Sequence, residues 1–188
     1  MEYTKKTSDE LLIAGCSKGD RVAQRSLYEK YYSTMFSLCA RYTCNEDDTM
    51  QILNDGFLKV FNKVSLYEFT GSFEGWIKRI MFRTALDFIR QNKSYKANIA
   101  LSDNQIDYDG EVYNNVLNSM HGEMINKIIQ KISPASRTVF SMFLIDGYSH
   151  KEIAQTLQIS ENTSKWHLCN AKNQFIAIAQ PHLAELFA

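Results

Sequence analysis

Two stretches of the chain carry side chains whose types and spacing could contact nucleic acid. In the first, residues 72–92, apolar residues recur at helical spacing, and on a helical wheel they form one face. The opposite stripe combines cationic, aromatic and acidic groups: Trp76, Arg79, Arg83, Asp87 and Arg90, with Lys78, Lys93 and Lys96 nearby. Arginine binds phosphate, and an exposed indole can stack on an unpaired base for about 1–3 kcal/mol. The stripe therefore suits partly melted DNA; the alternative is a solvated charged face with Trp76 half buried.

The second stretch, residues 147–172, has the pattern of a helix-turn-helix. Ser149 and Glu152 form a capping box, and Ser160 can cap a second helix after a tight turn. The inward positions of that helix are Ser164, Leu168, Ala171 and Phe175. The outward stripe is rich in amides and is flanked by lysines: Asn162, Thr163, Trp166, Asn170 and Asn173, with Lys165 and Lys172. Asparagine can bond adenine bidentately in the major groove, so the stripe could recognise base edges, although a plain helical hairpin stays open.

Composition and length limit how these stretches can be positioned. The 188 residues are 45% hydrophobic and 22% charged, with two prolines, which is typical of a folded, largely helical protein. The length allows one large or two small domains. The formal charge is zero, so either DNA is not the partner, or another protein supplies most of the DNA affinity.

Helical patterns occupy both ends of the chain. A capping box at Thr7 and Glu10 predicts the first helix, and further helices are expected at about 23–43, from 47 to before 70, and 72–92. Residues 94–118 are acidic and lack periodicity, which indicates an extended linker. We therefore expect an all-α fold of two small helical domains, 1–95 and 120–188, joined by a flexible acidic linker, 96–119, with the helix-turn-helix in the C-terminal domain.

Several function classes have no residues to support them. The N-terminus lacks a secretion signal, and no run approaches the roughly 18 apolar residues of a membrane span. The four cysteines form no C-x-x-C pair, and the four histidines lie far apart in sequence. No nucleotide-binding, hydrolase or zinc-protease motif occurs. We expect a cytoplasmic protein that is not an enzyme and that holds neither metal nor cofactor.

The order of several motifs resembles the sigma-70 family, specifically its extracytoplasmic-function subgroup, which keeps only the second and fourth conserved domains. Residues 55–61 (DGFLKVF), 71–80 (GSFEGWIKRI) and 84–90 (TALDFIR) are similar to domain two. Residues 132–134, 137, 139–140, 147–149 and 152–163 are similar to domain four. The resemblance covers nearly the whole chain and implies a transcription initiation factor. Its implied partners are core RNA polymerase, through the clamp of the largest subunit, promoter DNA and an anti-sigma factor, without membrane insertion.

The resemblance also implies a role for each matching residue. Core-polymerase binding falls to Asp55, Phe57, Leu58 and Phe61, of which Phe57 also suits a core position. Opening and recognition of the minus-10 element fall to Tyr67, Phe73, Trp76, Arg79, Arg83, Asp87, Arg90 and Lys93. Recognition of the minus-35 element falls to Ser160, Asn162, Thr163, Lys165, Trp166, His167, Asn170 and Lys172.

The sequence departs from the family pattern at three positions, Gln51, Gln158 and Ser164; Gln158 replaces the glycine usual in the turn between the two helices. The main alternative function is a stand-alone helix-turn-helix regulator of transcription, with the N-terminal helices as a sensor or dimerisation module. Acidic residues that offset the lysines and arginines of the C-terminal part argue against it, because such regulators are clearly basic.

Overall fold

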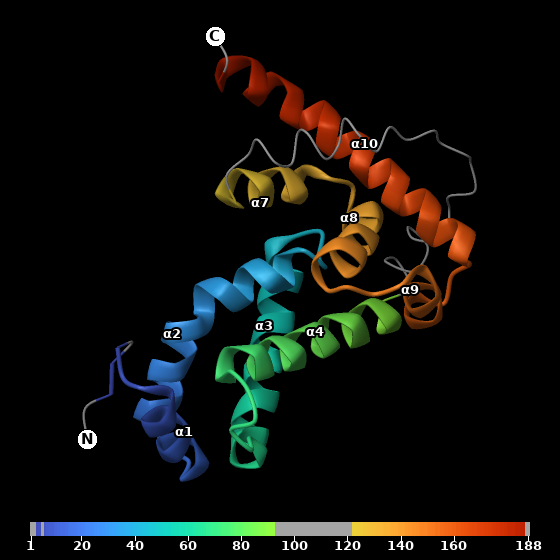
Figure 1. The fold of residues 1–188 in the computed structure, drawn as a ribbon. Helices are drawn as coiled ribbons and strands as arrows, with labels where there is room; N and C mark the ends of the chain where they lie inside the picture. The colour runs from blue at the N-terminus through green and yellow to red at the C-terminus, as the bar shows by residue number, and fades with distance from the viewer. Residues whose placement is uncertain (1–2, 5, 93–121, 187–188) are drawn as a thin grey trace. The chain divides into compact units, whose positions relative to one another are not determined.

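The structure is a computed structural model that describes residues 3–4, 6–92 and 122–186 (Figure 1). These residues fold into helices joined by turns, without a strand in the described ranges. The expectation of an all-α fold is confirmed. The chain divides into two compact units, Met1–Phe88 and Ile89–Ala188, called here the N-terminal and C-terminal units. The predicted linker and both predicted domain boundaries lie outside the described residues.

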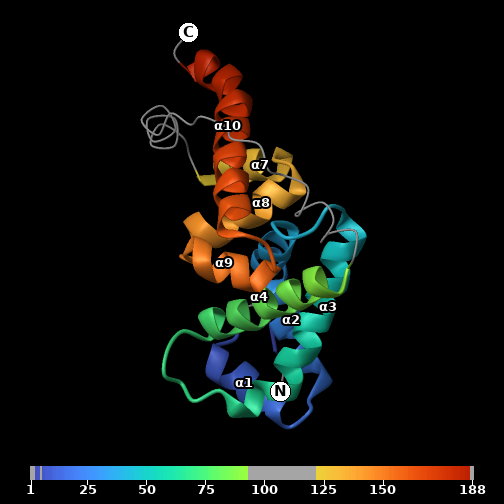
Figure 2. The same cartoon turned by 90° about the vertical axis from the view of Figure 1, so that its right-hand side faces the viewer.

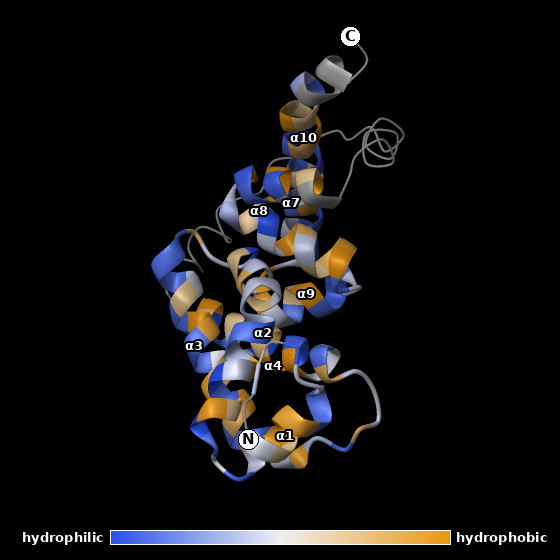
Figure 3. Ribbon diagram, turned by 90° about the vertical axis from the view of Figure 1, so that its left-hand side faces the viewer, coloured by the Kyte–Doolittle hydropathy of each residue, from blue (hydrophilic) through white to orange (hydrophobic). Residues whose placement is uncertain are grey.

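The N-terminal unit consists of four α-helices and one turn of 3-10 helix. They are α1 (Asp9–Ser17), α2 (Arg21–Ala40), α3 (Glu46–Lys63), the 3-10 turn η1 (Val64–Leu66) and α4 (Phe73–Gln91). The last residues of α4, from Ile89, are counted with the C-terminal unit. Figures 1 and 2 show α4 crossing α3. Colouring by hydropathy alternates along these helices, as expected of amphipathic elements (Figure 3).

Polar side chains start three of these helices. Asp20 accepts hydrogen bonds from the amides of Val22 and Ala23, and Asn45 accepts one from Asp48. Ser72 accepts from the amide of Gly75, as predicted for the start of α4.

The capping box predicted at Thr7 and Glu10 is wrong. The N-cap of α1 is Ser8, which makes no side-chain bond. Thr7 lies in the preceding turn, where its amide donates to the carbonyl of Thr4 and its hydroxyl accepts from the amide of Thr4. The hydroxyl that the sequence assigned to the helix is therefore used by the turn.

A tight contact between α3 and α4 defines the core of the N-terminal unit. Phe57, Ile77 and Met81 are at most 1% exposed. A Cβ atom built on Gly56 of α3 would lie 2.2 Å from Sδ of Met81, so a larger residue at this crossing would require the Met81 side chain to move. Burial also raises the pKa of Cys16 to about 11 and that of Cys39 to about 12, so both thiols are protonated core groups.

The C-terminal unit is built around its last helix. Its elements are α7 (Gly122–Lys131), α8 (Pro134–Phe140), the π-helical turn η2 (Ser141–Ile145), α9 (His150–Leu157) and α10 (Glu161–Leu186). The rings of Phe140 and Phe175 stack 6.1 Å apart between α8 and α10. None of the helices among the described residues has the length and apolarity needed to cross a membrane.

The helix-turn-helix pattern is present as expected. Ser149 and Glu152 form both bonds of the capping box at the start of α9. Ser160 accepts from the amide of Thr163 and caps α10. Between them, Gln158 adopts the left-handed conformation, with φ 59° and ψ 45°, that glycine adopts most easily. The turn therefore keeps its geometry without a glycine.

Candidate nucleic-acid interface

An aromatic cluster stands at the start of α4. The ring of Phe73, 4% exposed, stacks on Trp76 at 5.6 Å and 14° and lies 5.0 Å from Tyr67. Tyr67 also contacts the rings of Trp76 and Phe69, and its hydroxyl donates to the carbonyl of Gly71. Phe73 is thus the buried support, whereas Trp76 is half buried with part of its ring open to solvent.

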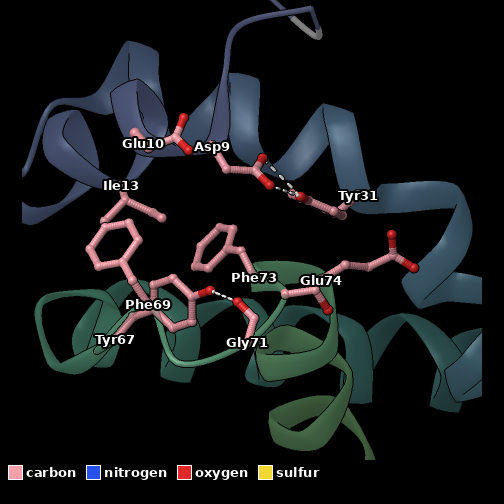
Figure 4. A pocket seen from close by; sticks show the side chains of 10 residues that line it. Asp9, Glu10, Ile13, Tyr31, Tyr67, Phe69, Gly71, Phe73 and Glu74 are labelled. Atoms are coloured by element: carbon pink, nitrogen blue, oxygen red, sulfur yellow. Dashed lines mark hydrogen bonds between the residues drawn. The ribbon is translucent and has the colours of Figure 1, made fainter.

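The loop 67–72 separates two hollows, of about 430 Å³ and about 410 Å³. The first is lined by acidic and aromatic residues: Asp9, Glu10, Ile13, Tyr31, Tyr67, Phe69, Gly71, Ser72, Phe73 and Glu74. In Figure 4 the side chains of Ile13, Tyr67, Phe69 and Phe73 converge on it, and the carboxylate of Asp9 turns to Tyr31. The second hollow includes Arg79, the only arginine that lines either hollow. Its lining residues are Leu66, Tyr67, Glu68, Thr70, Gly71, Ser72, Gly75, Trp76 and Arg79.

Two of the three acidic groups that line the first hollow, Asp9 and Glu74, have partners of their own. The carboxylate of Asp9 accepts from the hydroxyl of Tyr31 and from Lys30, each at 2.8 Å. Burial is the main cause that raises the pKa of Tyr31, and the hydrogen bond to Asp9 is the second. Glu74 pairs with Lys78 at 2.6 Å. The first hollow is therefore an acidic and aromatic environment that disfavours phosphate, and the second, with Arg79, favours it.

The cationic stripe of α4 is on the surface, as the wheel predicts. Arg79, Arg83 and Arg90 are exposed. The acid of the stripe, Asp87, is also exposed, and one of its oxygens lies 3.7 Å from Nζ of Lys59 on α3. The predicted site residue Lys93 lies outside the described residues. Two arginines beside a half-exposed indole give the N-terminal unit groups for both phosphate contact and base stacking.

On α10 the amide-rich stripe is only partly on the surface. Asn162 and Lys165 are exposed. Thr163, which the wheel assigned to the outward stripe, is 8% exposed, and its hydroxyl lies 2.8 Å from that of Ser160. The placement of Thr163 on the outward stripe is therefore wrong. Trp166 is half buried, and its indole N–H finds no acceptor among the described residues.

A buried hydrogen-bond network holds the middle of α10 against α8. His167 is 1% exposed, and its Nδ1 lies 3.1 Å from the hydroxyl of Ser136. The same hydroxyl accepts from the side-chain amide of Asn170 at 3.0 Å. Two of the residues predicted to contact DNA therefore make internal bonds, and in this conformation His167 has no surface with which to reach a partner. Sequence reasoning missed Ser136, since 31 residues separate it from His167.

Two further titratable groups sit on the helix-turn-helix. His150 stacks on Phe143 at 4.5 Å, and its Nδ1 lies 2.9 Å from the hydroxyl of Ser164. Burial and then the neighbouring Lys165 hold the pKa of His150 below its ordinary value. Burial likewise lowers the pKa of Lys172, which is half buried. Of the two predicted lysines, Lys165 is the one fully available to phosphate.

The residues predicted to bind polymerase occupy α3. Asp55 is exposed and Leu58 is 58% exposed, which is high for a large apolar side chain. Phe61 is half buried and stacks on Phe57 at 6.0 Å. Phe57 itself is 1% exposed and is a core residue, so it supports this surface from beneath and is not part of it.

Two family models match the chain: residues 27–95 match Sigma-70 region 2, and residues 122–175 match Sigma-70, region 4. The chain is 28% identical to the ECF RNA polymerase sigma factor SigW of Bacillus subtilis, over 81% of this chain and 87% of that protein. It is 25% identical to the ECF RNA polymerase sigma factor SigE of Mycolicibacterium smegmatis, over 89% of this chain and 66% of that protein. A solved structure of CnrH with the cytosolic domain of CnrY is similar to it, with TM-score 0.46 and 17% identity, over 92% of this chain and 97% of that one.

Proposed function

This chain belongs to the sigma-70 family, in its extracytoplasmic-function subgroup, and on that premise we propose how its two units share the work of promoter recognition. The protein is a transcription initiation factor that gives RNA polymerase its choice of promoter. The alternative of a stand-alone regulator is not favoured, because the region 2 match covers most of α2 and all of α3 and α4, which such a regulator would not need.

The N-terminal unit binds the minus-10 element in its melted form. The observation that carries this proposal is the position of Trp76. Its ring stacks on that of buried Phe73, and it lines a hollow of about 410 Å³ together with Arg79. A planar ring with one face supported and one side open can stack on an unpaired base. Arg79 and Arg83 then contact the phosphates on either side of that base. The ring of Tyr67, which lies 5.6 Å from that of Trp76 and lines the same hollow, forms the wall that a displaced base would meet.

The C-terminal unit binds the minus-35 element as duplex DNA. Asn162 near the start of α10 meets base edges, while Lys165 and the end of the helix capped by Ser160 meet phosphate. Asn170 has one amide hydrogen committed to Ser136, so its carbonyl oxygen is the atom left to accept from a base. Thr163 and His167 act from inside by fixing the position of the helix.

Docking on the polymerase uses α3. Leu58 supplies an exposed apolar side chain whose burial favours association, and Asp55 supplies a charge one turn away that can pair with a cation of the partner. Core polymerase then supplies the DNA affinity that a chain of zero net charge lacks. On the same premise the protein has no catalytic activity of its own, acts in the cytoplasm where the polymerase is, and has an anti-sigma factor as a further partner.

A gel shift on promoter DNA, with and without purified core polymerase, tests the proposal. We expect retention at physiological salt with the polymerase present and none with the isolated chain. Specific retention of the isolated chain at that salt would instead support the stand-alone regulator. A control DNA with both promoter elements scrambled should give no shift in the presence of polymerase.

A further inference from the structure

We infer that the first hollow, between α1 and the loop 67–72, binds the quaternary ammonium group of a small molecule. The hollow measures about 430 Å³ and is lined by four aromatic rings and three carboxylates (Figure 4). All of its lining residues belong to the N-terminal unit. Binding here needs neither polymerase nor DNA, so it is independent of the proposed function.

The aromatic side chains form one continuous wall of the hollow. The ring of Phe73 lies 6.0 Å from that of Tyr31 and 5.0 Å from that of Tyr67. The ring of Tyr67 in turn lies 4.9 Å from that of Phe69, which is 59% exposed. Neighbouring rings are tilted by 53° to 76°, so more than one ring face is available to a group in the hollow. A cation over the face of an aromatic ring is attracted by the charge distribution of the ring.

The charge of the hollow favours a ligand with a single positive charge. Asp9 is paired with Lys30 at 2.8 Å, and Glu74 is paired with Lys78 at 2.6 Å. The carboxylate of Glu10 is exposed and makes no ion pair or hydrogen bond with any residue that the structure describes. One negative charge of the lining is therefore left for a ligand, and it attracts a cation and repels an anion.

The hydrogen bonds of the hollow favour a cation that has no N–H group. The hydroxyl of Tyr31 donates to Asp9, whose carboxylate also accepts from Lys30. The hydroxyl of Tyr67 donates to the carbonyl of Gly71. A primary ammonium brings three N–H donors and a guanidinium five, and donors that leave water without an acceptor cost binding energy. A quaternary ammonium group brings none, and aromatic rings beside a carboxylate suit it.

Saturation-transfer difference NMR on the free full-length protein, at constant ionic strength, tests the inference with choline as the probe. We expect transfer from the aromatic protons of the protein to the N-methyl groups of choline. The neutral isostere 3,3-dimethyl-1-butanol has the same shape without the charge and should bind about tenfold more weakly. Glycine betaine and glycerophosphocholine carry an anion beside the same head group. Both should bind more weakly than choline, because Glu10 repels the anion.

Variants of the lining locate the bound choline. Phe69→Leu removes an exposed ring and Glu10→Gln removes the unpaired charge, and each should weaken choline binding about fivefold. The matched controls are Leu66→Ala and Glu68→Gln. Both positions are exposed and line the second hollow but not the first, so neither change should alter the affinity.

Three results would overturn the inference. Equal binding of choline and its neutral isostere would mean that the hollow takes apolar groups without regard to charge. Unchanged affinity in both Phe69→Leu and Glu10→Gln would mean that choline binds elsewhere. Transfer to deoxyadenosine with none to choline would mean that the hollow accepts a base.

The unmodified protein provides a measurement that does not depend on the folding of a variant. If Phe69→Leu or Glu10→Gln loses its helical circular dichroism, the methyl resonances of Ile13, which lines the hollow, decide. Choline should shift them and the neutral isostere should not. Resonances that choline leaves unchanged would overturn the inference.

Discussion

The two DNA-binding surfaces proposed here use their polar and aromatic side chains in opposite ways. On α4 the arginines Arg79 and Arg83 are exposed, and a buried ring, Phe73, supports the aromatic group beside them. On α10 the polar groups of His167 and Asn170 are bonded inside the unit, to Ser136. The difference shows that a polar stripe on a helical wheel mixes exposed residues with residues whose polar groups are bonded inside the unit.

The largest expected effect concerns the support of the α4 surface. Phe73→Ala removes a buried ring that touches Tyr67, Trp76 and Tyr31, and should lower the free energy of unfolding by about 3–5 kcal/mol. Phe69→Ala, at a ring that is 59% exposed, should cost below about 1 kcal/mol. Urea unfolding followed by circular dichroism measures both. Equal losses in the two variants would mean that Phe73 is not the support.

A template with a pre-melted minus-10 element separates the two surfaces directly. On duplex promoter DNA, Trp76→Ala and Asn162→Ala should each weaken complex formation by about 1–3 kcal/mol, through lost stacking and a lost base contact. On the bubble template the Trp76→Ala penalty should shrink, while the Asn162→Ala penalty should persist. Binding to both templates with core polymerase present measures this. Equal rescue of the two variants, or of neither, would contradict the division between melting and duplex recognition.

Ser136→Ala tests whether the inner network of the C-terminal unit positions α10. The change leaves His167 and Asn170 without their shared partner and should lower the free energy of unfolding by about 1–2 kcal/mol. It should weaken binding to all minus-35 sequences alike, whereas Asn162→Ala should alter sequence preference and leave stability unchanged. Thermal unfolding and competition between promoter sequences provide the two measurements. A change of preference in Ser136→Ala would show that the network also takes part in recognition.

The smallest expected effect lies in the turn between α9 and α10. Gln158→Gly should raise the free energy of unfolding by roughly 0.5–1 kcal/mol, because glycine adopts positive φ without the steric cost of a side chain. Gln155→Gly, at an exposed position inside α9, should instead destabilise by about 1 kcal/mol. Urea unfolding of the two variants gives the comparison. Destabilisation by Gln158→Gly would mean that contacts of the glutamine side chain outweigh the strain of its backbone.

Local signals in the sequence predicted the helices well. The pair Ser149 and Glu152 lies three residues apart, so the start of α9 is encoded within one turn of chain. The error at Thr7 is also local, because two neighbouring hydroxyl residues can each cap a helix and the preceding turn decides between them. The helical periodicity of α4 likewise distinguishes its exposed arginines from its buried apolar residues, and this prediction needs no information on the neighbouring helices.

The parts of the site that the sequence could not predict depend on residues far apart in the chain or on an unfavoured backbone conformation. The exposure of His167 depends on Ser136, whose partnership no periodicity reveals. Phe69 adopts a positive φ of 56°, against the preference of a bulky side chain, and its side chain lines the first hollow. Phe57 matched the docking motif but is core, because α2 covers it through the ring of Tyr28.

The crossing at Gly56 lies between the two surfaces to which the proposed function assigns different partners. On α3 the Gly56 side meets Met81, and Leu58 lies about 200° around the helix from it, towards the proposed polymerase contact. On α4 the residues Arg79 and Arg83 lie two positions on either side of Met81, and so face away from α3. In the proposed function, the thickness of these two packed helices separates the surface that binds polymerase from the surface that binds promoter DNA. A larger residue at position 56 would require the Met81 side chain to move or the two helices to separate, and separation would displace the proposed DNA-binding residues without touching either partner.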